Sequence, residues 1–415
     1  MTTGERIAKS RDRSVIVGFG VVAVSAILYW LANRGYDAGR GDFFYLADAF
    51  LDGRTWLEFR PGSGQSNDVI IVGDRFYVPF APFPAVALMP LVAIIGPIAA
   101  DQIESGVNAL LAAGGVGLCW WLLGRIGVPR TIDRLWLTIL FGFSTQILWV
   151  TTRGGVWHTG HLVATILTLA CLVELYGRRR VWLIGLMAGA AFMTRAPLAF
   201  AVPIYALMLA PEGTLAPRRL LDDAVGTIRA IPWRTWFVFG LAVLPSLVAF
   251  FAYNQLRFGT PLESGYSLAT LPDWLEAQRQ RGLFSIVHIP MNLDYFLINL
   301  PDLIDQPPFF RPDGMGMSVL LTSPALLLAF WADWRRRDVQ LLWLATLLVL
   351  VPTLLYYGGG WLQYGYRYFL DSVPFVIALC ALAVVRSGTL GWGWKVLIAL
   401  GTVVMAFGVY WAYNL

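Results

Sequence analysis

The chain has 415 residues, of which 57% are hydrophobic and only 14% are charged, and its mean hydropathy is +0.63. A soluble globular chain carries about 25% charged residues, so this composition excludes an ordinary soluble protein. The net charge of +5 comes almost entirely from arginine, since Lys9 and Lys395 are the only lysines. Because the arginines gather between apolar blocks, they are predicted to set membrane orientation, and no nucleic-acid partner is expected.

The apolar residues form blocks of about 15–22 residues, the length that crosses a hydrocarbon core about 30 Å thick. The first block, 15–32, follows a basic N-terminus, but no small-residue cleavage site closes it and further spans follow. We therefore expect a retained helix and not a signal peptide. The three cysteines lie inside apolar blocks and indicate no function. The fold class predicted is an all-α polytopic membrane protein.

Loop charge predicts the orientation of the spans. Five basic segments are expected to face the cytoplasm: the N-terminus, 125–134, 178–180, 218–234 and 335–337. Three apolar blocks precede Arg125, but only two crossings keep that arginine inside. The block 78–98 carries five prolines, which break helical hydrogen bonding. It is predicted to be a bent juxtamembrane or re-entrant segment on the outer side.

The stretch 181–210 is too long for one crossing and short for two, and Arg195 lies at its middle. An even number of crossings there requires a tight hairpin with Arg195 at the turn. The other predicted spans are 103–124, 135–150, 160–176, 235–253, 318–332, 339–356, 368–386 and 394–412. The prediction is a single transmembrane domain, 1–415, with about eleven crossings, a cytoplasmic N-terminus and an external C-terminus. This topology leaves two large regions outside the membrane, 33–98 and 254–317.

The first external region carries Asp37, Arg40, Asp42 and Tyr45. A carboxylate at a membrane surface suits a general base that takes a proton from an acceptor group. The alternative is that Asp42 caps the helix predicted to follow it.

The same region continues to Asp68, Asp74 and Tyr77. Two carboxylates on one loop could hold a divalent metal. No Asp-x-Asp pair occurs in this loop, however, so a metal is only weakly supported and no cofactor is expected.

His158 and His161 stand three residues apart, on one face of the next span. A metal site would need a third ligand, and His288 is the only other histidine. The two histidines are interpreted either as donors to an anionic ligand or as satisfied interfacial side chains.

Arg195 stands in an apolar stretch, where an arginine is costly and is by default a hypothesis of function. Its planar guanidinium suits phosphate. The alternative is a buried pair with a carboxylate such as Glu174 or Asp48.

Two later segments combine aromatic and basic residues. The second external region opens with Tyr253 and Arg257, and the last external turn contains Tyr364, Tyr366 and Arg367. Tyrosine at that depth can belong to an aromatic belt at the membrane surface. The alternative is a ligand pocket built around the arginine.

Five segments carry a resemblance to a known superfamily. They are LADAFLDGR at 46–54, YVPFAPFP at 77–84, GLMAGAAFMTR at 185–195, YNQLRFGTPLESGY at 253–266 and GYRYFLDSVP at 365–374. In this pattern the chain resembles the GT-C membrane glycosyltransferases, nearest the family 39-like protein O-mannosyltransferase and aminoarabinose-transferase type.

The resemblance implies inverting transfer of a sugar from a polyprenyl-phosphate-linked donor to a lipid, glycan or protein acceptor. It also implies a site on the external, periplasmic face of a bacterial cytoplasmic membrane. Asp42 is the residue carried over as base, with Asp37 as competitor because the common Asp-Glu pair is absent. His158 matches a polar residue at the start of the fourth span, and Arg195 matches the basic residue after a glycine-rich span.

In this interpretation the phosphate meets Arg195 or Arg367, and aromatic residues stack on the sugar. Alternatives from other classes are a secondary transporter and a non-catalytic component of a cell-envelope polysaccharide assembly system. No repeat relates the two halves of the chain, and its acids gather on one predicted side, which favours an enzyme over a transporter.

Overall fold

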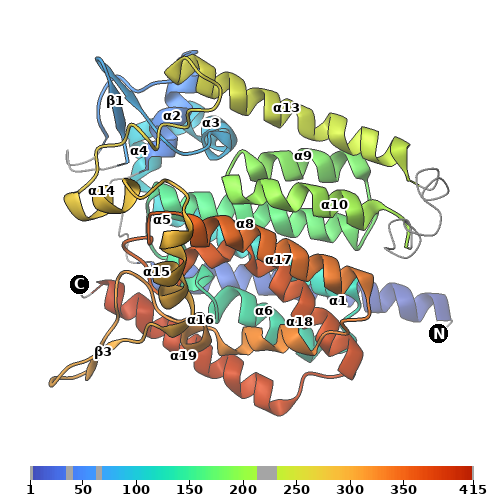
Figure 1. Cartoon of the computed structure of the whole chain (residues 1–415). Coiled ribbons are helices and arrows are strands. Elements are labelled where there is room, and N and C mark those ends of the chain that lie inside the picture. Colours follow the sequence, from blue (N-terminus) through green and yellow to red (C-terminus); the bar gives the residue numbers. More distant parts are fainter. Residues whose placement is uncertain (1–2, 34–40, 62–67, 213–230, 414–415) are drawn as a thin grey trace.

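The structure is a computed structural model that describes residues 3–33, 41–61, 68–212 and 231–413 (Figure 1). Helices dominate these residues. The strands found among them form two short antiparallel hairpins, β1 (Ile70–Val72) with β2 (Arg75–Tyr77) and β3 (Asp302–Leu303) with β4 (Phe310–Arg311). The predicted all-α polytopic class is therefore confirmed.

Six helices in the described residues are long and apolar enough to cross a membrane. They are α1 (Thr3–Ala32), α5 (Glu104–Ile126), α8 (Val156–Leu175), α13 (Trp233–Phe258), α17 (Arg337–Leu355) and α19 (Trp392–Tyr413). The 23 residues of α5, for example, rise about 35 Å, slightly more than the hydrocarbon thickness. Shorter apolar helices accompany the six, and the count of eleven crossings stays a prediction.

Two predicted spans are interrupted. The block 135–150 forms α6 (Thr131–Phe143) and α7 (Ile147–Thr151), with three buried polar residues between them. The block 318–332 forms α16 (Val319–Thr322) and then the 3-10 helix η4 (Pro324–Trp331). Proline at the start of η4 has no N–H to continue the α-helical ladder, so the helix type changes there.

Arg195 lies at a break between helices. Helix α9 (Val181–Phe192) ends just before it, and the 3-10 helix η1 (Ala196–Ala201) and α10 (Val202–Leu209) follow. Arg195, the N-cap of η1, has an extended backbone with φ −144° and ψ 114°, and this separates the two helical pieces. Pro197 lies in the first turn of η1, where its missing N–H costs no helical hydrogen bond. The chain reverses direction at this break, and α9 and α10 lie side by side.

The helical bundle has two distinct ends (Figure 1). One end carries the start of α1 and the turns that follow α5 and α8, where basic residues gather; we call it the basic end. The other end carries α2 (Asp42–Leu51), α3 (Phe83–Ile95), α4 (Pro97–Gln102) and the hairpin β1–β2. We call it the site end. Helix α19 finishes there, so the chain starts and finishes at opposite ends, as an odd number of crossings requires.

The proline-rich block 78–98 supplies α3 and the start of α4, both of which pack against α2 at the site end. Helix α3 has only 13 residues and contains Pro90. Beyond α13, short elements cover the same end: α14 (Asp273–Arg279), the 3-10 helix η2 (Ile286–His288), α15 (Ile289–Leu293) and the π-helix η3 (Asp294–Ile298).

Helix α8 lies in the middle of the bundle. Of its most apolar window, 72% is buried inside the protein, against 11% for α13. Polar side chains on α8 therefore face other protein groups and not lipid, and each buried one needs a partner.

Candidate functional site

The site end holds a buried cluster of charged and aromatic side chains. We call it the Asp371 cluster; it consists of His158, His161, Arg195, Arg367, Tyr368 and Asp371. Asp371 is 1% exposed. Its carboxylate accepts hydrogen bonds from Arg195 Nε, at 2.9 Å to Oδ2 and 3.1 Å to Oδ1. His161 Nδ1 lies 3.1 Å from Oδ1. One carboxylate therefore fixes side chains from two other segments of the chain.

Local sequence brings these segments together. Helix α8 begins after Gly155, whose φ of +129° suits glycine, and the histidines follow on its first turns. The 3-10 helix η5 (Arg367–Asp371) leads into α18 (Val373–Ser387), which has proline in its first turn. Arg195 enters from the break after α9. Three helix boundaries thus meet at one point.

Tyr368 is the centre of the cluster. The guanidinium of Arg195 lies 5.6 Å from the centroid of its ring, and that of Arg367 lies 5.5 Å from it. The His161 ring centroid is 6.1 Å away. The face of a tyrosine ring attracts cations, so Tyr368 keeps the two arginines close together. Asp371 is the carboxylate that pairs with one of them, Arg195.

Arg195 is the most accessible charged group of the cluster. Its side chain is 18% exposed, whereas the side chains of Asp371 and His161 are fully buried. The bonds to Asp371 use Nε, so the two terminal nitrogens point their N–H groups elsewhere. This fork is suited to a bidentate contact with a phosphate.

Helix α2 packs against the same part of α8. A Cβ added at Gly160 would lie 3.8 Å from the Phe43 ring, so the helix that carries Asp42 contacts the turn that carries His161. Asp42 is 1% exposed. The capping interpretation of Asp42 is wrong, because Asp42 is the first residue of α2 and its N-cap is Gly41.

Tyr45, on α2, donates to Asp101 at the end of α4 with a distance of 3.1 Å. Burial, followed by the charge of Asp101, raises the pKa of Tyr45 to about 12, so its hydroxyl stays a donor. Asp101 also accepts from the Gly41 N–H at 3.0 Å. This carboxylate therefore anchors the start of α2 and with it Asp42.

A second polar group supports the start of α8. Glu104, at the start of α5, is fully buried and accepts from the Gly155 N–H and from the Thr159 hydroxyl, the latter at 2.8 Å. Asn108 donates to the Arg153 carbonyl at 3.2 Å. These bonds hold the turn before α8 and thereby set the direction of His158.

A third group surrounds Arg257. Its guanidinium donates to the Val78 carbonyl at 2.7 Å and to Asn254 at 2.8 Å, and it lies 3.8 Å from the Tyr253 ring centroid. Tyr77 packs beside it, against Phe258. These residues tie α13 to the segment that precedes α3, outside the Asp371 cluster.

The remaining sequence-predicted residues lie at varied distances from the cluster. Tyr366 packs edge-on to Tyr368 with centroids 5.7 Å apart. Tyr364 points the other way and donates to the Val404 carbonyl of α19. Asp68 lies close enough to Tyr266 for its charge to act on that tyrosine; burial raises the pKa of Tyr266, and the charge of Arg195 opposes the rise. Asp37 and Arg40 lie outside the described residues.

Arg195 forms a pair with a buried carboxylate, as the alternative interpretation expected, but its partner is Asp371, which the sequence interpretation did not assign to it. The expected carboxylate partners of Arg195 were Glu174 and Asp48, but Glu174 pairs with Arg180 at 2.6 Å. An acidic residue inside the predicted span 368–386 was the available signal, because a buried arginine needs a buried acid.

Metal ligation finds no support in the described residues, which contain no group of three or more His, Cys, Asp or Glu side chains suited to an ion. His288 lies on η2, where Nε2 is 2.8 Å from the Gly282 carbonyl. Among the described residues it forms no such group with His158 and His161.

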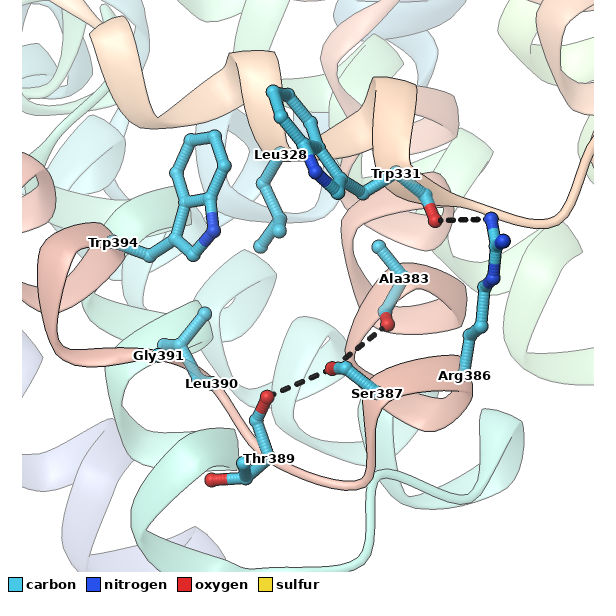
Figure 2. A pocket seen from close by; sticks show the side chains of 9 residues that line it. All are labelled: Leu328, Trp331, Ala383, Arg386, Ser387, Thr389, Leu390, Gly391 and Trp394. Atoms are coloured by element: carbon cyan, nitrogen blue, oxygen red, sulfur yellow. Dashed lines mark hydrogen bonds between the residues drawn. The ribbon is translucent and has the colours of Figure 1, made fainter.

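A groove of about 510 Å³ lies at the basic end, between α18 and α19 (Figure 2). Its lining includes Trp331, Trp394 and Arg386, and Arg386 donates to the Trp331 carbonyl at 3.2 Å. The 15 residues of α18 separate it from the Asp371 cluster by about 22 Å. It is not part of the same site.

The fold and the cluster together define a polytopic helical membrane protein with paired arginines buried at one end of its bundle. No protein-family model matches the chain, and no curated protein matches it. Among solved structures it is similar to the crystal structure of ArnT from Cupriavidus metallidurans bound to undecaprenyl phosphate, with a TM-score of 0.49 and 14% sequence identity.

The match with ArnT covers 92% of this chain and 62% of ArnT, so the chain spans less than two thirds of ArnT's length. The undecaprenyl phosphate of that structure is bound to ArnT.

Proposed function

We propose that the chain is a membrane glycosyltransferase that moves a sugar from a polyprenyl-phosphate-linked donor to an acceptor. The donor's prenyl tail lies along the apolar helices and its phosphate meets the Asp371 cluster. The reaction takes place at the outer face of the cytoplasmic membrane, the side opposite the arginine-rich loops.

One observation carries the proposal: two arginines lie within 5.6 Å of one ring centroid at the end of an apolar bundle, Arg367 buried and Arg195 with 18% of its side chain exposed. A guanidinium pair in a low-dielectric environment is costly unless an anion completes it. Asp371 supplies one negative charge, and a phosphate would supply the rest. A lipid phosphate is the anion that an apolar bundle can receive from the side.

The chemistry follows from these contacts. The terminal nitrogens of Arg195, together with Arg367, stabilise the charge that develops on the leaving phosphate. Asp42, on the helix that contacts α8, removes the proton from the acceptor as its oxygen or nitrogen attacks the anomeric carbon. The bond between that carbon and the phosphate oxygen breaks, which inverts the anomeric configuration. Asp37 is the competing base.

Transfer in proteoliposomes tests the proposal. Proteoliposomes are prepared from the purified chain and undecaprenyl-phosphate donors that carry a radiolabelled sugar. The radiolabel that reaches the acceptor fraction is then measured. We expect transfer by the wild type, with a loss of about 100-fold or more for Asp42→Asn or Asp37→Asn, whichever residue is the base. If both variants kept full activity, the assigned base would be wrong.

A second measurement separates the enzyme from the transporter alternative. Sealed vesicles are loaded and the movement of the intact lipid-linked sugar across the bilayer is followed. Flux of the intact donor without any transfer of its sugar would overturn the proposed function and favour a transporter.

A further inference from the structure

Two histidines on the first turns of α8 each use one ring nitrogen inside the protein. His161 Nδ1 lies 3.1 Å from the Asp371 carboxylate, and His158 Nδ1 lies 3.1 Å from the Gly154 carbonyl. Carbonyl and carboxylate oxygens only accept hydrogen bonds, so both Nδ1 atoms carry the proton. In the neutral ring, Nε2 is then an acceptor with a free lone pair.

Neither Nε2 atom has a hydrogen-bond partner among the described residues, and both are buried. The two rings stand three positions apart and so project from the same face of α8. Buried polar atoms in native proteins are nearly always paired, so two neighbouring orphan acceptors indicate a ligand that donates hydrogen bonds.

The charges around the histidines restrict that ligand. Arg195 and Arg367 bring two positive charges to the Tyr368 ring, and Asp371 brings one negative charge that already binds Arg195 and His161. With the donor's phosphodiester bound, these charges balance, so an ammonium group buried beside the histidines would have no counter-ion of its own, which is costly.

We infer that His158 and His161 accept hydrogen bonds from hydroxyl groups of the donor sugar, and that this sugar is a neutral polyol and not a cationic amino sugar. The inference rests on the proposed function and adds the class of sugar. Arg195 binds the phosphate at the accessible edge of the cluster, and the hydroxyls of the sugar donate to the two buried Nε2 atoms on α8. Asp371 and the Gly154 carbonyl are positioning groups, since they fix the tautomer of each ring.

Binding measurements with defined lipids test this inference. The full chain in nanodiscs is titrated with undecaprenyl-phosphate mannose, glucose and galactose, with their monodeoxy analogues, and with undecaprenyl-phosphate 4-amino-4-deoxyarabinose. We expect at least one neutral hexose to bind about tenfold or more tightly than the amino sugar. Removal of a recognised hydroxyl is expected to weaken binding about tenfold.

Variants locate the effect at the histidines. His161→Phe and His158→Phe keep an aromatic ring but lack the acceptor, so each is expected to bind the parent hexose as weakly as one monodeoxy analogue. His161→Gln restores an acceptor and is expected to recover part of the discrimination. Cys171→Ala, farther along α8, where the thiol bonds to the Ile184 carbonyl, serves as the control and is expected to bind like the wild type.

The outcomes separate the two claims. Tighter binding of the amino sugar, or unchanged discrimination in both Phe variants, would overturn the inference and leave the proposed function standing. If none of these lipids bound the wild-type chain, the proposed function would fail, and the inference with it.

Discussion

Two of the buried carboxylates in the described residues, Asp371 at the site end and Asp133 at the basic end, have different surroundings. Asp133 is fully buried and faces Lys395 Nζ at 3.2 Å, the Leu390 N–H at 3.1 Å and the Thr389 hydroxyl at 3.3 Å. A single cation thus balances it, and the backbone and hydroxyl groups both donate to its other oxygen, Oδ2. This ion pair joins α6 to α19 and has a structural role.

Asp371, in contrast, faces more positive charge than it can balance. Arg195 and Arg367 share the Tyr368 ring, and His158 and His161 each leave one nitrogen unpaired. The comparison teaches that a buried charge alone does not indicate a site; an arrangement that its own residues leave incomplete does. The predictions below test whether the two ends differ in this way.

The largest effect is expected for Arg195→Ala. Loss of a charged donor to the leaving phosphate should lower transfer about 100- to 1,000-fold. Arg195→Lys keeps the charge but not the planar fork, and it should retain only part of the activity. Initial rates in proteoliposomes measure both variants.

The matched control for Arg195 is Arg386→Ala, which removes an arginine from the groove at the basic end. We expect its transfer rate to stay within about twofold of the wild type, since a surface substitution away from the site changes little. An equal loss of transfer in both variants would mean that the two ends do not differ as described.

The next effect compares the carboxylates directly. Asp371→Asn and Asp133→Asn each leave a buried cation uncompensated, at a cost of about 3–5 kcal/mol in the free energy of unfolding. Thermal unfolding in detergent measures this cost. Only Asp371→Asn should also lower transfer per folded molecule, by about 100-fold, because it releases both Arg195 and His161.

The smallest effect is expected for Glu104→Gln. The neutral amide weakens the charge-assisted bonds to the Gly155 N–H and the Thr159 hydroxyl, so the turn that directs His158 loosens. Transfer should fall about tenfold, chiefly through a higher KM for the donor. A change in kcat alone would contradict a positioning role for this turn.

Much of the architecture follows from the sequence because membrane spans have a strong signal. Length, hydropathy and arginine position were enough to predict α1, α5, α8, α13, α17 and α19, and the cost of a charge in an apolar stretch indicated Arg195. The breaks inside 135–150 and 318–332 were not predicted, since they depend on packing around buried polar residues and on local proline geometry.

The candidate site was predicted only in part. His158, His161, Arg195 and Arg367 meet in space, but Asp371 was overlooked because it follows Arg195 by 176 positions and resembles a residue at the edge of a span. Tyr364 shows the converse limit. Its neighbours in sequence face the cluster, yet its own hydroxyl binds α19, because the backbone turns between positions 364 and 366.

The most direct test is a cryo-electron microscopy structure of the chain in nanodiscs with undecaprenyl phosphate. The account predicts phosphate density within hydrogen-bond distance of the terminal nitrogens of Arg195, near Arg367, with the prenyl tail along the apolar helices. Phosphate density only at the basic end, beside Arg386 and Trp331, with none at the Asp371 cluster, would contradict it.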